Sequence, residues 1–149
     1  QGSLVYKQLS DEKGQTFPDF KNLSRKWATG AEYIALYPNV LLGVHRDHAY
    51  VIILLPLSFS ETIENVHIYY SQPDANPSLK KKNKKQWKEI FEEDIFVVEG
   101  MQAGRFGIKF DGGRFSPKMD EPTHCFHDWV ASKVDDFRNQ NRQIASVTE

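Results

Sequence analysis

The chain has 149 residues, of which 40% are hydrophobic, 13% aromatic and 26% charged, and this composition is typical of one globular domain. Its formal net charge of −1 gives no electrostatic reason to expect nucleic acid or an anionic membrane surface as a partner. The longest apolar run, residues 51–57, is too short to cross a bilayer. Cys125 is the one cysteine, which excludes an internal disulfide and favours a cytoplasmic setting, and we expect it to be a small buried residue.

The N-terminal half predicts an irregular arm followed by strands. Residues 1–26 are mixed and polar, and we expect one short strand there, at residues 4–9. β-Branched and aromatic residues then dominate, and turn residues interrupt them. We expect strands at residues 32–38, 39–45, 49–59 and 64–72. The short connections between them predict an antiparallel meander with a hairpin tip at residues 45–48.

The C-terminal half predicts two helices. Residues 72–82 form an expected linker whose lysine run favours a solvated approach to a helix over a phosphate-binding patch, since no glycine loop or interleaved aromatic residue accompanies it. At residues 83–103, apolar side chains recur every three or four positions, which predicts a helix. A glycine-rich loop and a second helix at residues 122–139 follow. Sheet and helices together predict an α+β fold with a single domain at residues 27–149.

Asp94 is the residue that the helical pattern leaves unexplained. It lies between Phe91 and Val98 on or near the apolar stripe of the first helix, and a carboxylate that faces a core needs a partner. Its partner would be a cationic side chain, backbone donors or a divalent metal ion. Glu93 points about 100° away around the helix, so it is the weaker candidate for such a role.

The histidines offer few alternatives as metal ligands. His45 and His48 flank the hairpin tip, where we expect exposed turn residues, and His67 should pack in a strand or face solvent. His124 and His127 are three positions apart on the second helix. A pair at this spacing can bind a metal, but the surrounding aromatic residues favour packing and capping.

Three stretches in this order resemble the catalytic domain of Rieske non-haem iron oxygenases, the alpha subunits of ring-hydroxylating dioxygenases. They are YIALYPNVLLGVHRDHAYVIILLPL, FEEDIFVVEGMQAG and GRFSPKMDEPTHCFHDWV, and the resemblance covers roughly residues 17–139. It implies a helix-grip fold of the START and Bet v 1 type, in which a curved antiparallel sheet wraps a long helix around a cavity.

The resemblance also implies a role for the first helix. In this family two histidines and one carboxylate hold iron(II) and leave positions open for oxygen, and the matching carboxylate is Asp94. Phe91 and Val98, one turn to either side, would help to shape the substrate pocket. The complete enzyme would take electrons from a reductase or ferredoxin and hydroxylate or demethylate a small aromatic or amine substrate.

The chain departs from the family pattern in two respects. One cysteine cannot hold a [2Fe–2S] cluster that needs two cysteines and two histidines, and the first histidine is His45, so the family's upstream histidine pair is missing. We therefore expect the C-terminal part of a catalytic domain, incomplete as a helix-grip fold, without bound Fe(II) and without turnover on its own. The alternative is a metal-free small-ligand binding module. A third hypothesis is an interaction protein that forms a homo-oligomer, since family members commonly assemble as trimers or higher oligomers and exposed apolar surface would let the fragment pair with itself.

Overall fold

The computed structural model describes residues 2–3 and 6–147, which fall into two compact units divided after residue 110. The elements of the first unit are β1 (Gly2–Ser3), a 3-10 helix (Arg25–Trp27), β2 (Ala31–Leu36), β3 (Val40–Val44), β4 (His48–Pro56), β5 (Thr62–Tyr70) and α1 (Pro77–Gly104). The second unit contains α2 (Glu121–Val147). The predicted α+β class is confirmed, and an antiparallel sheet with a long helix along one face agrees with the predicted helix-grip type.

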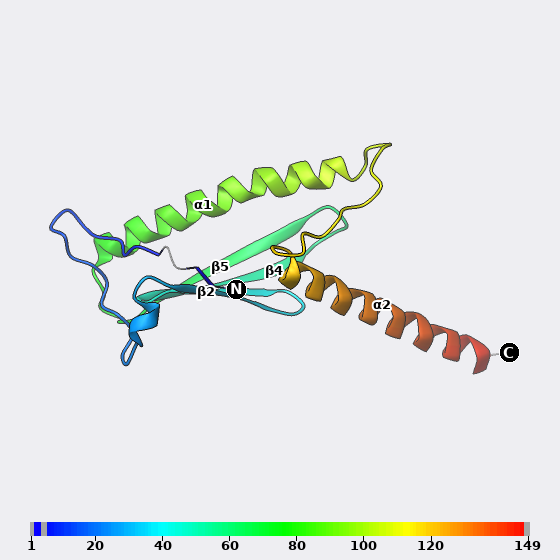
Figure 1. Ribbon diagram of the computed structural model, residues 1–149, viewed down its shortest axis with the longest axis horizontal. Coiled ribbons are helices and arrows are strands. Elements are labelled where there is room, and N and C mark those ends of the chain that lie inside the picture. The colour runs from blue at the N-terminus through cyan, green and yellow to red at the C-terminus, as the bar shows by residue number, and fades with distance from the viewer. Residues whose placement is uncertain (1, 4–5, 148–149) are drawn as a thin grey trace. The chain divides into compact units, whose positions relative to one another are not determined.

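The strands form one antiparallel sheet in the order β1-β2-β3-β4-β5, which confirms the predicted meander (Figure 1). Each predicted strand is shifted or shortened by a few residues. In β4 the burial alternates, with Tyr50 and Ile52 buried on the face toward α1. Tyr50 is paired with Gly43 of β3, and its ring lies where a Cβ on that glycine would be.

Helix α1 starts at Pro77 rather than at residue 83, so the prediction of a linker at residues 72–82 is wrong in its second half. The reason is a helix cap: the side chain of Asn76 accepts a hydrogen bond from the backbone N–H of Ser78 over 2.9 Å, and a proline suits the first helical position. Within the first unit α1 runs along one face of the sheet (Figure 1). Trp87 and Phe91 contact Tyr50 there, with ring centroids 4.7 and 5.3 Å apart.

The N-terminal segment contributes to the core of the first unit. Phe17 is buried together with Ala75 and Leu79, and Tyr70 packs on this cluster. The hydroxyl of Ser71 donates a hydrogen bond to the carbonyl of Pro18. Of the strand predicted at residues 4–9, the first two residues lie outside the described residues and residues 6–9 are not in a strand.

Helix α2 ends at Val147, beyond the predicted end at residue 139. Before its first turn, the backbone N–H of Ser116 donates to the carboxylate of Asp120 over 2.7 Å. The expectation that Cys125 is buried is wrong, because it lies on an exposed face of α2. No helix in the described part of the chain combines the length and the apolarity needed to cross a membrane.

Candidate functional site

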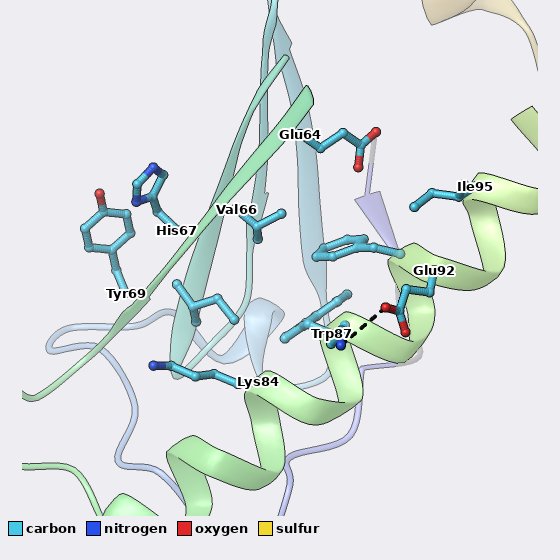
Figure 2. A pocket seen from close by; sticks show the side chains of 11 residues that line it. Glu64, Val66, His67, Tyr69, Lys84, Trp87, Glu92 and Ile95 are labelled. Atoms are coloured by element: carbon cyan, nitrogen blue, oxygen red, sulfur yellow. Dashed lines mark ion pairs between the residues drawn. The ribbon is translucent and has the colours of Figure 1, made fainter. Parts of the chain in front are cut away.

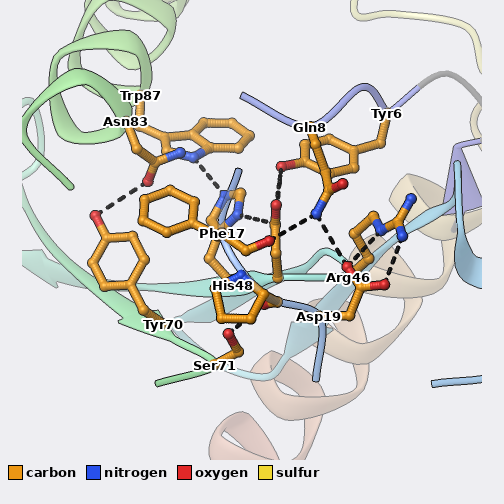
Figure 3. Close-up of polar contacts among 12 residues, drawn as sticks. Tyr6, Gln8, Phe17, Asp19, Arg46, His48, Tyr70, Ser71, Asn83 and Trp87 are labelled. Atoms are coloured by element: carbon orange, nitrogen blue, oxygen red, sulfur yellow. Dashed lines mark hydrogen bonds and ion pairs between the residues drawn. The ribbon is translucent and has the colours of Figure 1, made fainter. Parts of the chain in front are cut away.

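A chain of hydrogen-bonded side chains, buried at its centre and half-buried at its two ends, joins the N-terminal segment, the β3–β4 hairpin and α1 (Figure 3). The hydroxyl of Tyr6 donates to the Asp47 carboxylate over 2.9 Å. Asp47 lies 2.7 Å from Nδ1 of His48, and both side chains are fully buried. The indole N–H of Trp87 completes the chain, 2.8 Å from Nε2 of His48. Side chains from three segments that are far apart in the sequence thus satisfy one another's hydrogen bonds.

These contacts fix the protonation of the His48 ring. An indole N–H can only donate, so Nε2 of His48 must be the acceptor. Nδ1 therefore carries the proton and donates to Asp47. Burial alone would raise the pKa of the Asp47 carboxyl, but the hydrogen bonds from His48, Tyr6 and Gln8 together hold that pKa below its ordinary value.

His45 is stacked on His48, with ring centroids 4.6 Å apart and planes 6° from parallel. It is only 3% exposed, and its Nδ1 makes no hydrogen bond within the described residues. Burial and the neighbouring His48 lower the pKa of His45 to about 4, against a smaller opposing effect of Asp47. The ring is therefore neutral at physiological pH.

The prediction that His45 and His48 are exposed turn residues is wrong. The hairpin tip is covered by Tyr6 from the N-terminal segment and by Trp87 from α1, which lie far away in the sequence. Arg46 of the same turn pairs with Asp19 at 2.6 Å, which further ties the N-terminal segment to the hairpin.

A cavity of about 570 Å³ lies between β5 and α1 (Figure 2). Its apolar wall is formed by Val66, Ile68, Trp87, Phe91 and Ile95, and its charged and polar lining by Glu64, His67, Tyr69, Lys84, Lys88 and Glu92. The rings of Trp87 and Phe91 stack with centroids 5.5 Å apart. This volume falls in the range of sites that hold small molecules.

The structure places the three predicted site residues, Asp94, Phe91 and Val98, in different environments. Phe91 is half-buried and lines the cavity. Val98 is 62% exposed and is not among the lining residues. Asp94 is exposed, so the expectation that it faces a core is wrong. It nevertheless lies close enough to Tyr50 to contribute, after burial and Tyr33, to raising the pKa of that phenol to about 12.

Asp94 therefore lies near the face of α1 that packs on the sheet, but its side chain is exposed to solvent. Among the described residues no group of three His, Cys, Asp or Glu side chains is arranged to hold a metal ion. The described residues therefore do not bring together the set of two histidines and one carboxylate that the resemblance implies. Whether Asp94 is a ligand stays a prediction.

The remaining candidates, the histidine pair of α2 and the lysine run of α1, make contacts within their own segments. His124 and His127 both place their rings against Phe115, at 5.0 and 5.1 Å between centroids. Nδ1 of His124 lies 3.1 Å from Asp128. In the lysine run, Nζ of Lys80 donates to the carbonyl of Pro73 over 2.6 Å, in the segment that precedes α1.

Sequence reasoning missed the buried chain of Tyr6, Asp47, His48 and Trp87. One signal was present: an aspartate between two histidines in HRDH is unusual enough to suggest a paired imidazole. Nothing local indicated that Tyr6 and Trp87 would complete the chain, because each is brought to the hairpin by tertiary packing alone.

The comparisons with known proteins agree with this fold. The family model for the ring hydroxylating alpha subunit (catalytic domain) matches residues 6–136. No curated protein and no solved structure matches the chain.

Proposed function

Since the chain belongs to the ring-hydroxylating alpha subunit catalytic-domain family, we propose that it forms the C-terminal part of the catalytic domain of an iron-dependent oxygenase. In this role, β5 and α1 form one wall of the substrate cavity and Asp94 supplies the carboxylate ligand. The family match is the observation that carries the proposal. The proposal includes a cytoplasmic setting and a reductase or ferredoxin as electron donor.

The cavity between β5 and α1 supports a small, partly aromatic substrate. Trp87 and Phe91 offer stacked ring faces, and large aromatic rings bind flat apolar molecules well. Charged side chains stand at its rim, where Lys88 and Glu92 pair at 3.4 Å. An aromatic or amine substrate of modest size is consistent with this lining.

Iron(II), when bound to its two histidines and one carboxylate, supplies the activation of dioxygen in this family. The chain's own contribution is the position of Asp94. The helix that carries it is tied to the sheet by the hydrogen bond from Trp87 to His48 and by the packing of Phe91 on Tyr50. The two histidine ligands would have to come from outside the three stretches that carry the family resemblance.

The second candidate is a metal-free binding module for small apolar ligands. It is favoured by the aromatic cavity combined with the lack of a three-ligand group among the residues that the structure describes.

Iron content separates the two candidates. We would reconstitute the chain anaerobically with iron(II) and compare it with Asp94→Ala and with Glu93→Ala as the matched control. If the chain binds iron, the ligand role expects the Asp94 variant to lose most of it and the Glu93 variant to retain it, and equal iron in all three proteins would show that the ligand role is wrong. If none of the three holds iron, Asp94 is an orphaned ligand in this chain, and the fragment or the binding-module interpretation stands. A Phe91→Ala variant that weakens the binding of indole in isothermal titration calorimetry would then support the binding module.

A further inference from the structure

We propose that the cavity between β5 and α1 takes an elongated, planar molecule with an acidic group at one end and a basic group at the other. The acidic group would pair with Lys84 and the basic group with Glu64, while Trp87 and Phe91 would stack on the flat part between them. The inference rests on the proposed function, in which this cavity holds the substrate, and it defines the chemical class of that substrate.

The cavity is long and narrow. Its lining runs along β5 from Glu64 to Tyr69 and along α1 from Lys84 to Ile95. At about 3.3 Å per residue of a strand and about 1.5 Å per residue of a helix, both stretches span about 16 Å. The volume of about 570 Å³, spread over this length, leaves a mean cross-section of only about 35 Å². Such a space suits an extended molecule better than a rounded one.

Two aromatic rings of α1 form a flat wall on one side of this space. The rings of Trp87 and Phe91 lie 21° from parallel, with centroids 5.5 Å apart. The indole N–H of Trp87 donates to His48 over 2.8 Å, and Phe91 packs edge-on against Tyr50, so contacts behind the wall hold both rings. A planar molecule can therefore stack on the wall without displacing it.

The two ends of the cavity carry opposite charges. Figure 2 shows Lys84 at one end, reaching toward β5, and Glu64 at the other, reaching toward α1. Among the residues that the structure describes, neither takes part in an ion pair. Lys88 and Glu92, which also line the cavity, pair with each other at 3.4 Å. Of these four side chains, one cation at one end and one anion at the other are therefore left for a ligand.

A ligand that fills the cavity removes water from both ends. A charge that loses water without gaining a partner costs free energy. A molecule with one charged end would therefore satisfy either Lys84 or Glu64 and leave the other less well solvated, whereas a molecule charged at both ends pairs with both. The direction of binding is fixed as well, because the reversed pose would bring like charges together.

Isothermal titration calorimetry of the full chain tests the inference with 4-(aminomethyl)cinnamate, a flat molecule that is charged at both ends. Two matched probes each lack one charge: 4-methylcinnamate has no amine, and 4-vinylbenzylamine has no acid. Since exposed ion pairs contribute modestly, we expect each of these to bind about two- to fivefold more weakly. The counterpart with a saturated ring and side chain should also bind more weakly, because it cannot stack on Trp87 and Phe91.

Substitutions at the two ends test the orientation. Lys84→Gln should weaken the binding of both acids and leave that of 4-vinylbenzylamine unchanged, whereas Glu64→Gln should weaken the binding of both amines and leave that of 4-methylcinnamate unchanged. Lys81→Gln and Glu99→Gln are the matched controls, since both residues are exposed on α1 and lie outside the cavity lining. Lys84→Glu should weaken the binding of the doubly charged probe, and adding Glu64→Lys should restore it in the opposite direction.

Equal affinities for the three probes overturn the inference, as do end variants that affect every probe alike and a chain that binds none of them. Iron plays no part in these titrations, so their outcome is separate from that of the iron reconstitution. A chain that shows the expected pattern without holding iron keeps the ligand class and loses the oxygenase role. A chain that holds iron through Asp94 without the pattern keeps the oxygenase role and loses the doubly charged substrate class.

Discussion

Trp87 donates its indole N–H to Nε2 of His48 over 2.8 Å, and this bond joins α1 to β4 through two side chains 39 positions apart. It also fixes the imidazole tautomer, because His48 must then carry its proton on Nδ1 and donate that N–H to Asp47. The bond therefore couples the position of the helix that carries Asp94 to a buried histidine pair in the hairpin. The predictions that follow concern this coupling and the packing around it.

Trp87→Phe keeps an aromatic ring but removes the donor. His48 then has a buried acceptor without a hydrogen bond, which costs about 1–3 kcal/mol of unfolding free energy. Urea denaturation followed by circular dichroism measures the difference. Trp27→Phe, outside this network, is the control and should change stability by less. Equal losses for the two variants would mean that the hydrogen bond contributes little.

Asp47→Asn removes the charge that accepts from His48 and Tyr6. Hydrogen bonds to charged groups contribute more than neutral ones, so we expect a loss of about 2–3 kcal/mol. Tyr6→Phe removes only one of these donors and should cost about 1 kcal/mol. The two losses should not add in the double variant, since both residues belong to one network. Additive losses in the double-mutant cycle would argue against a direct interaction.

His45 makes stability depend on pH. Its pKa in the folded protein is lowered to about 4, whereas an unfolded histidine has a pKa of about 6.5. Between these values the unfolded chain holds a proton that the folded chain does not, so stability falls as the pH is lowered through this window. The contribution is complete above the unfolded pKa, and its slope is at most about 1.4 kcal/mol per pH unit.

Denaturation at several pH values within this window measures the effect. His45→Gln should remove this part of the slope, and His67→Gln, at an exposed position of β5, should not. If the His45 variant keeps the full slope, another group is responsible for the pH dependence.

Gly43→Ala should disturb the packing of Tyr50. A Cβ at this position would lie 2.2 Å from Cζ of Tyr50, so the ring must move away from its contacts with Trp87 and Phe91. Overpacking of this kind costs about 1–3 kcal/mol. Gly100→Ala is the control, and it should raise stability where Gly43→Ala lowers it. It lies within α1 with nothing within 4 Å of the added atom, and removing a helical glycine stabilises by about 0.5–1 kcal/mol. Thermal unfolding distinguishes the two directions.

The sequence by itself determined the order of the elements and the antiparallel meander, because apolar periodicity and turn residues act locally. Three stretches in order, one of them around Asp94, also indicated the family. The start of α1 could have been found as well, since Asn76 and Pro77 form a recognisable helix cap.

Only the tertiary structure decided what surrounds the hairpin tip and Asp94. The burial of His45 and His48 depends on Tyr6 and Trp87, which contact the turn from 39 or more positions away, and no local pattern encodes that contact. In the sequence, Asp94 falls at the helical spacing of the apolar residues of α1. Its exposure, however, depends on which part of the fold packs against that position. The physical reason is the same in both cases: periodicity states which face of an element is apolar, whereas burial is a property of the surfaces that meet there.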